Sequence, residues 1–250
     1  MRATQHGRIR CAAVAVVGVW DPFLPSHASL LETLREHARS AERSATVVVL
    51  DPPPGSISGF APQYGTHGWP VYNSVGVRIR LIRGHGVDAV LRVRFRRRDF
   101  EATAAEFLDA VRSRLELAEL WLGELQLLGP GPQGARGAVA EYAERHDFRL
   151  TVLPRAPVGT YDIRNLLATG RLAEAIEIVG RPPTWARPPS GVLRLAWRPG
   201  RYRAVALRSP MSTGGAAMDV ILTAREDGPA RLTWPDRDIA YLAFVAGPAD

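Results

Sequence analysis

Lysine is absent from this chain of 250 residues, and cysteine occurs once, as Cys11. A single cysteine can build neither a disulfide framework nor a cysteine-based zinc site, so we expect a reducing cytoplasm and no metal centre of that kind. The chain also lacks any apolar run near the roughly 20 residues that a membrane span needs. The apolar stretch 11–20 runs straight into Asp21-Pro22 without a small-residue cleavage pattern, so we expect no secretion signal.

All 32 basic residues are therefore arginine, and the formal net charge is +7. This usage, with frequent proline and glycine, indicates a GC-rich coding genome. The charge permits an anionic partner such as a nucleotide, a phosphorylated metabolite or a nucleic acid. Because the arginines are spread along the chain, coding bias alone also explains them, and we expect a small nucleotide or anionic substrate rather than nucleic acid. A homodimer stays open.

Hydrophobic periodicity predicts alternating strands and helices over residues 12–179. Apolar, Val-rich runs predict buried parallel strands at 12–19, 46–50, 89–95, 120–122 and 150–153. Apolar residues three or four apart predict helices at 27–41, 75–83, 99–115, 137–146, 162–167 and 173–179, with Ser26 and Asp99 as N-caps of the first and third. The alternation implies an α/β fold, a Rossmann-like doubly wound parallel sheet.

The pattern changes at Arg181, where Pro182, Pro183, Pro188 and Pro189 mark a linker. Beyond it the apolar residues alternate with period two, and glycine-containing turns separate the runs. We therefore expect a small antiparallel β module of about five strands. The predicted organisation is an α/β domain over 1–183 and a β module over 184–250.

Ligands of open parallel sheets bind beyond the carboxyl ends of the strands. Three segments should lie there: Trp20–His27, Asp51–Pro54 and Val158–Arg164. The first joins a strand to a helix N-terminus, which attracts anions, so His27 could donate to a phosphate; a plain surface histidine is the alternative. A long loop carries aromatic rings that could contact a planar ligand or pack together, namely His67, Trp69 and Tyr72.

Arg92 and Arg94 alternate with apolar residues near the end of the third predicted strand. Arginines on a buried strand need anionic partners, so these two could bind a phosphate or a carboxylate substrate. The alternative is an ion pair with a nearby acid such as Asp99 or Glu101, or an edge strand with one face in solvent.

Gly18-Val19-Trp20-Asp21 with His27 is similar to Gly-Phe-Asp-Gly-x-His-x-Gly-His, the signature of the nucleotidyltransferase superfamily. Further segments resemble, in order, the motifs of the adenylyltransferase half of prokaryotic bifunctional FAD synthase. They are Val49–Pro54 (Phe-Asp-Pro-His-Pro in that family), Leu122–Gly129 (Gly-x-Asp-Phe-x-Phe-Gly), Val158–Arg164 (Ile-Ser-Ser-Thr-x-Ile-Arg) and Leu166–Pro182 (a helix pair ending in Gly-Arg-Pro). The resemblance covers residues 10–183 and implies the nucleotidyltransferase fold.

The resemblance implies transfer of AMP from ATP to FMN or another phosphorylated acceptor, with Mg²⁺ and release of pyrophosphate. The cofactors would be ATP and Mg²⁺, with a flavin as the acceptor. His27 and Arg164 would donate to phosphate, and Asp21 would order the strand-end turn or a metal-bound water. The positions expected to bind the nucleotide or acceptor are Ser26, Thr160, Asp51, Gly123, Arg92 and Arg94.

Several motif positions depart from the family. Leu24 stands where the family has its first histidine, and Pro53 replaces the histidine of Asp-Pro-His-Pro. Loss of one such donor typically costs about 100-fold or more in rate. Three functions therefore stay open: a nucleotidyltransferase of altered efficiency or substrate, an enzyme recruited to other chemistry, and a non-catalytic ligand-binding or partner-binding homologue.

The β module faintly resembles the riboflavin kinase half of FAD synthase through Pro199–Val205. The Pro-Thr-Ala-Asn motif that holds metal and nucleotide in that kinase is missing from the sequence. We therefore expect a reduced remnant without kinase activity.

Overall fold

The computed structural model describes residues 2–7, 11–53, 56, 69–94, 96, 99, 101–124, 126–129, 131–156, 159–210, 212, 214–225 and 229–247. The chain forms two compact units. The first comprises Met1–Trp20, Ser26–Pro54 and Ile79–Pro157, and the second Asp21–Pro25, Gly55–Arg78 and Val158–Asp250. This division differs from the predicted boundary at residue 183, because the last two helices of the α/β region group with the β module.

A six-stranded sheet in the order β1-β4-β3-β2-β5-β6 forms the centre of the first unit. The strands are β1 (Arg2–Gly7), β2 (Ala13–Gly18), β3 (Ser44–Asp51), β4 (Ala89–Arg94), β5 (Leu117–Gly123) and β6 (Arg149–Leu153). The last five are parallel, in the order of a doubly wound nucleotide-binding sheet, so the predicted fold is confirmed. Strand β1 was not predicted; it is a largely polar edge strand that pairs antiparallel with β4.

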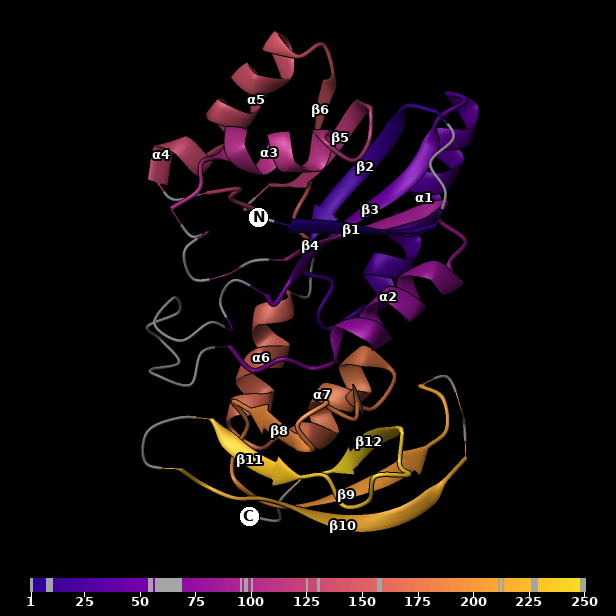
Figure 1. The fold of residues 1–250 in the computed structure, drawn as a ribbon, viewed down its shortest axis with the longest axis vertical. Helices are drawn as coiled ribbons and strands as arrows, with labels where there is room; N and C mark the ends of the chain where they lie inside the picture. The colour runs from indigo at the N-terminus through magenta and orange to yellow at the C-terminus, as the bar shows by residue number, and fades with distance from the viewer. Residues whose placement is uncertain are drawn as a thin grey trace. The chain divides into compact units, whose positions relative to one another are not determined.

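Both faces of this sheet are covered by helices (Figure 1). Helices α3 (Ala104–Arg112) and α5 (Arg136–Arg145) share one apolar core with the strands, while the short α4 (Gly131–Gly134) precedes α5. Helices α1 (Pro25–Ser40) and α2 (Val75–Gly84) lie on the opposite side. Burial on two faces explains why β3 is buried along its whole length and reads as a continuous apolar run.

Two predicted helix caps are wrong. Helix α3 begins after Thr103, whose hydroxyl accepts from the Glu106 N–H at 3.2 Å while the Glu106 carboxylate accepts from the Thr103 N–H at 2.8 Å. This reciprocal pair satisfies two helix-end donors, whereas Asp99 accepts the Arg96 N–H in the preceding turn. Ser26 is the second residue of α1, because Pro25 already has the backbone angle that a first helical residue needs.

In the second unit, helices α6 (Thr160–Ala168) and α7 (Leu172–Val179) share an apolar core with antiparallel strands. Four strands follow the order β10-β9-β12-β7 and two pair as β11-β8. They are β7 (Thr184–Ala186), β8 (Val192–Leu195), β9 (Gly200–Leu207), β10 (Ala216–Leu222), β11 (Ala230–Thr233) and β12 (Tyr241–Ala246). The predicted period-two strands are present, and β7 lies inside the predicted linker. No helix in the described ranges is long and apolar enough to cross a membrane.

Candidate functional site

The end of β2 carries the first group of predicted site residues. Trp20 has a φ of 58°, which turns its indole back over Gly18. A Cβ at Gly18 would lie 2.9 Å from the indole nitrogen, so only glycine fits under this ring. The indole N–H donates to the Val48 carbonyl at 3.3 Å, and its ring centroid lies 5.1 Å from that of the half-buried His27. Trp20 therefore lies against His27 near the carboxyl end of β2, a contact that was not predicted from the sequence.

Asp51 and Arg92 form an ion pair at the same edge. The Arg92 Nε donates to Asp51 Oδ2 at 3.0 Å, and one Nη donates to the same oxygen. The arginine pairs across strands with the end of β3, so its acid is Asp51 and not Asp99 or Glu101 as one alternative had it. Arg94 lies opposite Asp51 in register and is exposed, and no polar partner of its side chain is found in the described ranges. Arg97 and Arg98 lie outside the described residues.

Gly18, Val49 and Arg92 are register partners across β2, β3 and β4. Neighbouring strands are separated by about 4.8 Å, so this row spans about 10 Å. On the other side of β2, β5 ends at Gly123, where a Cβ would be 3.8 Å from Gln126 Oε1, an ordinary contact. The carboxyl edge of the first unit thus presents the half-buried His27 shortly after β2, and the ion-paired Arg92 and the exposed Arg94 on β4.

Asp21 and Arg164, both predicted as catalytic, are brought together inside the second unit. Their side chains are 0% and 1% exposed, and Arg164 Nη1 lies 3.5 Å from Asp21 Oδ2. The Asp21 carboxylate accepts the backbone N–H groups of Tyr72 at 2.8 Å and Asn73 at 2.7 Å. Asp21 therefore orders the backbone at residues 72–73, and both of its predicted roles, at the strand-end turn or at a metal-bound water, stay predictions.

The Arg164 guanidinium is bonded to the loop around residue 70 and to Asp21. It donates to the carbonyls of Pro70 at 2.6 Å and Asp21 at 2.5 Å, and it stacks 4.7 Å from the ring centroid of Trp69. Its predicted role as a phosphate donor stays a prediction, and the observed side chain points to backbone carbonyls.

Two of the three aromatic residues predicted in the long loop lie in the described part of the chain, and both make structural contacts. Tyr72 is fully buried, its hydroxyl donates to the Arg181 carbonyl, and burial raises the pKa of this hydroxyl. Burial likewise lowers the pKa of Arg181, whose guanidinium donates to the Phe23 carbonyl. Trp69 lies against Arg164, and His67 lies outside the described residues. The self-packed alternative therefore describes Tyr72.

The N-terminus of α6 carries a carboxylate. Asp162 lies in the first turn, and its Oδ2 accepts the Gly159 N–H at 3.3 Å. Thr160, predicted to bond a phosphate oxygen, is half-buried as the first residue of this helix. Asp162 is not among the predicted site residues, although an acid in the first turn of a helix is a recognisable signal of a helix start.

A second polar cluster lies on the α1 side of the first-unit sheet, away from the predicted site. Glu119 on β5 contacts His37 Nε2 at 2.7 Å and accepts from the indole of Trp121 at 2.8 Å and from the hydroxyl of Thr151. Burial would raise the pKa of Glu119, but the hydrogen bonds from these three partners outweigh it and lower that pKa. The carboxylate is thus held ionised and fully bonded, which is a structural arrangement.

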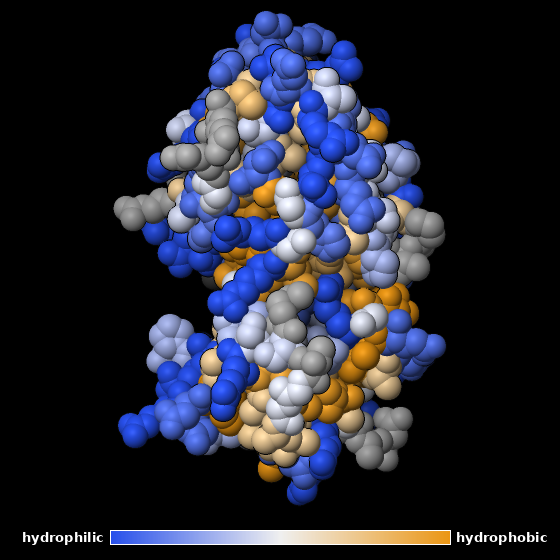
Figure 2. Space-filling model, turned by 90° about the vertical axis from the view of Figure 1, so that its right-hand side faces the viewer, coloured by the Kyte–Doolittle hydropathy of each residue, from blue (hydrophilic) through white to orange (hydrophobic). Residues whose placement is uncertain are grey.

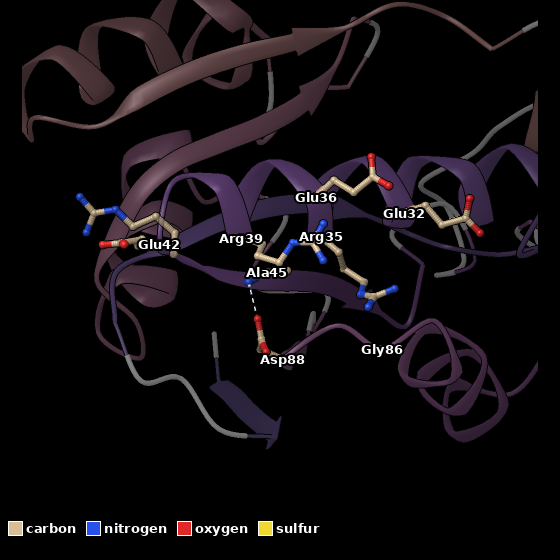
Figure 3. A pocket seen from close by; sticks show the side chains of 9 residues that line it. Glu32, Arg35, Glu36, Arg39, Glu42, Ala45, Gly86 and Asp88 are labelled. Atoms are coloured by element: carbon tan, nitrogen blue, oxygen red, sulfur yellow. Dashed lines mark hydrogen bonds between the residues drawn. The ribbon is translucent and has the colours of Figure 1, made fainter.

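The first unit also has a shallow polar cavity of about 580 Å³. It is lined by Glu32, Arg35, Glu36, Arg39, Glu42, Arg43, Ala45, Gly86 and Asp88 (Figure 3). Asp88 accepts the Ala45 N–H at 2.8 Å, at the amino end of β3 and β4. The surface over α1 is predominantly hydrophilic (Figure 2). Since ligands of such sheets bind at the opposite, carboxyl edge, this cavity is a charged surface feature and not the predicted site.

A family model described as FAD synthetase matches residues 7–165. The chain belongs to the FAD synthetase family. The match runs from the last residue of β1 to Asn165, so it includes the five parallel strands of the first-unit sheet and the N-terminal part of α6.

One solved structure resembles this FAD synthetase family member over both units. A macrolide-efflux protein from Streptococcus pneumoniae is similar over 97% of this chain and 88% of its own, with a TM-score of 0.63 and 15% sequence identity. At that identity the likeness shows the fold alone, including the β module. No curated protein matches the sequence.

Membership of the FAD synthetase family implies ATP, a flavin-related substrate and a metal. The α6 terminus does not fit a triphosphate, since its cation Arg164 is sequestered and its first turn already holds a carboxylate. The first-unit edge does fit a phosphate, because Arg92 and Arg94 outnumber Asp51 there and α1 has no acid in its first turn.

Proposed function

We propose that this member of the FAD synthetase family binds a phosphorylated planar ligand, of the flavin mononucleotide type, at the carboxyl edge of its first-unit sheet. The observation that carries the proposal is the Asp51–Arg92 ion pair with the exposed Arg94 beside it.

The ion pair orients a donor without neutralising the site. Asp51 takes the Nε and one Nη of Arg92, so the second Nη keeps its N–H groups for a ligand. Arg92 has a side-chain exposure of 25%, so part of this side chain is within reach of solvent. With Arg94 included, two cations face one carboxylate, and the net positive charge favours an anionic group.

The other end of the row suits an aromatic ligand. The ring of His27 lies against the ring of Trp20, two residues beyond Gly18, and the row from Gly18 to Arg92 spans about 10 Å. A flavin mononucleotide joins a planar ring system to a phosphate over a comparable length. The phosphate would lie at the arginines, and the ring system would lie towards His27.

Adenylyl transfer from ATP to FMN or another phosphorylated acceptor is the activity that family membership suggests. The observed contacts of Arg164 and Asp162 favour binding without this ATP-dependent transfer. The ligand would then be the flavin-type substrate of the family, retained without the nucleotide chemistry.

Flavin fluorescence quenching tests this proposal. FMN should bind at least about tenfold more tightly than riboflavin, which lacks the phosphate. Arg94→Gln should weaken FMN about five- to tenfold and leave riboflavin unchanged. The matched control is Arg43→Gln, which removes the same charge from an exposed residue just before β3 and should leave both affinities unchanged.

A turnover assay separates binding from transfer. With ATP, Mg²⁺ and FMN we expect neither FAD nor pyrophosphate. Catalytic formation of FAD would replace the proposal by adenylyl transfer, and equal affinity for FMN and riboflavin would remove the phosphate site.

A further inference from the structure

A side chain of α6 itself, Asp162, bonds an N–H group at the N-terminus of this helix. This helix of nine residues follows Gly159, whose N–H is bonded to Asp162 Oδ2 at 3.3 Å. The Asp162 side chain is exposed, so its charge faces the same solvent from which a ligand would approach.

A helix N-terminus ordinarily attracts anions through its unpaired N–H groups and its dipole. At α6 the carboxylate of Asp162 reduces both attractions. It occupies one N–H group, and it places a negative charge at the positive end of the helix dipole. A phosphate arriving there would meet a like charge within a few ångströms and would gain one donor fewer.

No cation of the same turn offsets this charge. Arg164 is two residues further on, but its guanidinium is 1% exposed and is bonded to Pro70 and Asp21 carbonyls. Tyr161, between Thr160 and Asp162, is 50% exposed and adds bulk without charge.

We infer that Asp162 is a specificity-determining residue that excludes phosphate groups from the α6 terminus. A group bound at this turn has to be neutral or cationic. The inference goes beyond the proposed function, which concerns the arginines of the first unit, and it leaves a triphosphate without its site at this motif.

The test is titration calorimetry with inorganic tripolyphosphate at low ionic strength, where charge effects are least screened. It uses the full chain carrying Arg94→Gln, which weakens any binding at the first-unit edge. Adding Asp162→Asn should raise the affinity at least about fivefold, because one repelled charge is removed while the amide oxygen can still accept the Gly159 N–H. The amide resonances of Gly159 and Thr160 should shift with the added anion only in this variant.

Glu177→Gln is the matched control. Glu177 is an exposed carboxylate on α7, so this change alters the net charge equally and should leave the affinity unchanged within about twofold. Asp162→Ser is the second variant if Asp162→Asn loses its circular dichroism spectrum, since a hydroxyl also accepts at a helix start.

An unchanged affinity in both Asp162 variants overturns the inference, as does an equal gain in Glu177→Gln. FMN binding plays no part in this readout, so the inference and the proposed function fail separately.

Discussion

Replacing Arg164 by methionine should destabilise the second unit severely. Methionine keeps a similar length of apolar chain but removes every donor of the guanidinium. If Arg164 were an idle phosphate ligand, the free energy of unfolding would hardly change. If it holds the loop as observed, two buried carbonyls and the Asp21 carboxylate lose their partner.

The magnitude follows from those three losses. Removing one member of a buried ion pair typically costs about 3–5 kcal/mol, because the other charge stays buried. Each buried carbonyl left without a donor costs about 1–3 kcal/mol, and these contributions overlap with the first. We therefore expect Arg164→Met to lower the free energy of unfolding by about 3–5 kcal/mol, a large share of a typical total of about 5–15 kcal/mol.

The assay is urea unfolding followed by tryptophan fluorescence and circular dichroism. The Trp69 ring lies 4.7 Å from the Arg164 guanidinium, so fluorescence should report the loss directly. Arg171→Met is the control, since that arginine is exposed and paired only with Glu174, and we expect no change. A loss below about 1 kcal/mol in Arg164→Met, or no coupling with Asp21→Asn in a double-mutant cycle, would refute the reasoning.

Three further outcomes are expected. The pKa of Glu119 is lowered in the folded chain, so its ionised form adds stability above about pH 4.3, and this stability is lost as the pH falls through the pKa of the folded state. In urea unfolding, the difference in free energy of unfolding between the native chain and Glu119→Gln should shrink over that pH range. A constant difference would contradict this prediction. Glu42 and Asp147 have φ of 54° and 53°, so Glu42→Gly or Asp147→Gly should raise the free energy of unfolding by about 1 kcal/mol, and a lowered urea midpoint would be the opposite result. Leu24 is 3% exposed in the second-unit core, so Leu24→His should lower the free energy of unfolding by about 2 kcal/mol or more. The variant should not produce FAD from ATP and FMN, and FAD in that assay would count against a purely structural role of Leu24.

The parallel strands were predictable because burial on two faces leaves a strong mark in the sequence. The run that became β2 and the run that became β3 are apolar at nearly every position. By contrast β1 is mostly polar and pairs on one side only, so no periodicity marked it. Thr103 was missed as a cap for a similar reason: Asp99 has the same local chemistry, and tertiary packing selects between them.

The positions of the predicted site residues in the fold were easier to predict than their contacts. The sheet rule placed His27 and Asp51 beyond strand ends, and the alternation of apolar residues placed Arg92 near the end of a strand. The partner of Arg92 depended on cross-strand register, which sequence spacing does not specify. The inward orientation of Arg164 depends on carbonyls of Pro70 and Asp21, which lie 94 and 143 residues away in the chain.

The second unit draws on three separate stretches of chain, and this has a consequence for how the polypeptide matures. Asp21 leaves the ribosome 143 residues before Arg164, its buried counter-charge. Asn73 accepts a hydrogen bond from the Thr184 N–H, and the Trp197 indole donates to the Val71 carbonyl. Residues 71–73 therefore gain these hydrogen bonds only after Thr184 and Trp197 have been synthesised. A nascent or truncated chain ending at residue 183 would leave the Val71 carbonyl and the Asn73 side chain without these two donors. Residues 184 onwards therefore stabilise a segment far earlier in the chain, and we expect their removal to destabilise it.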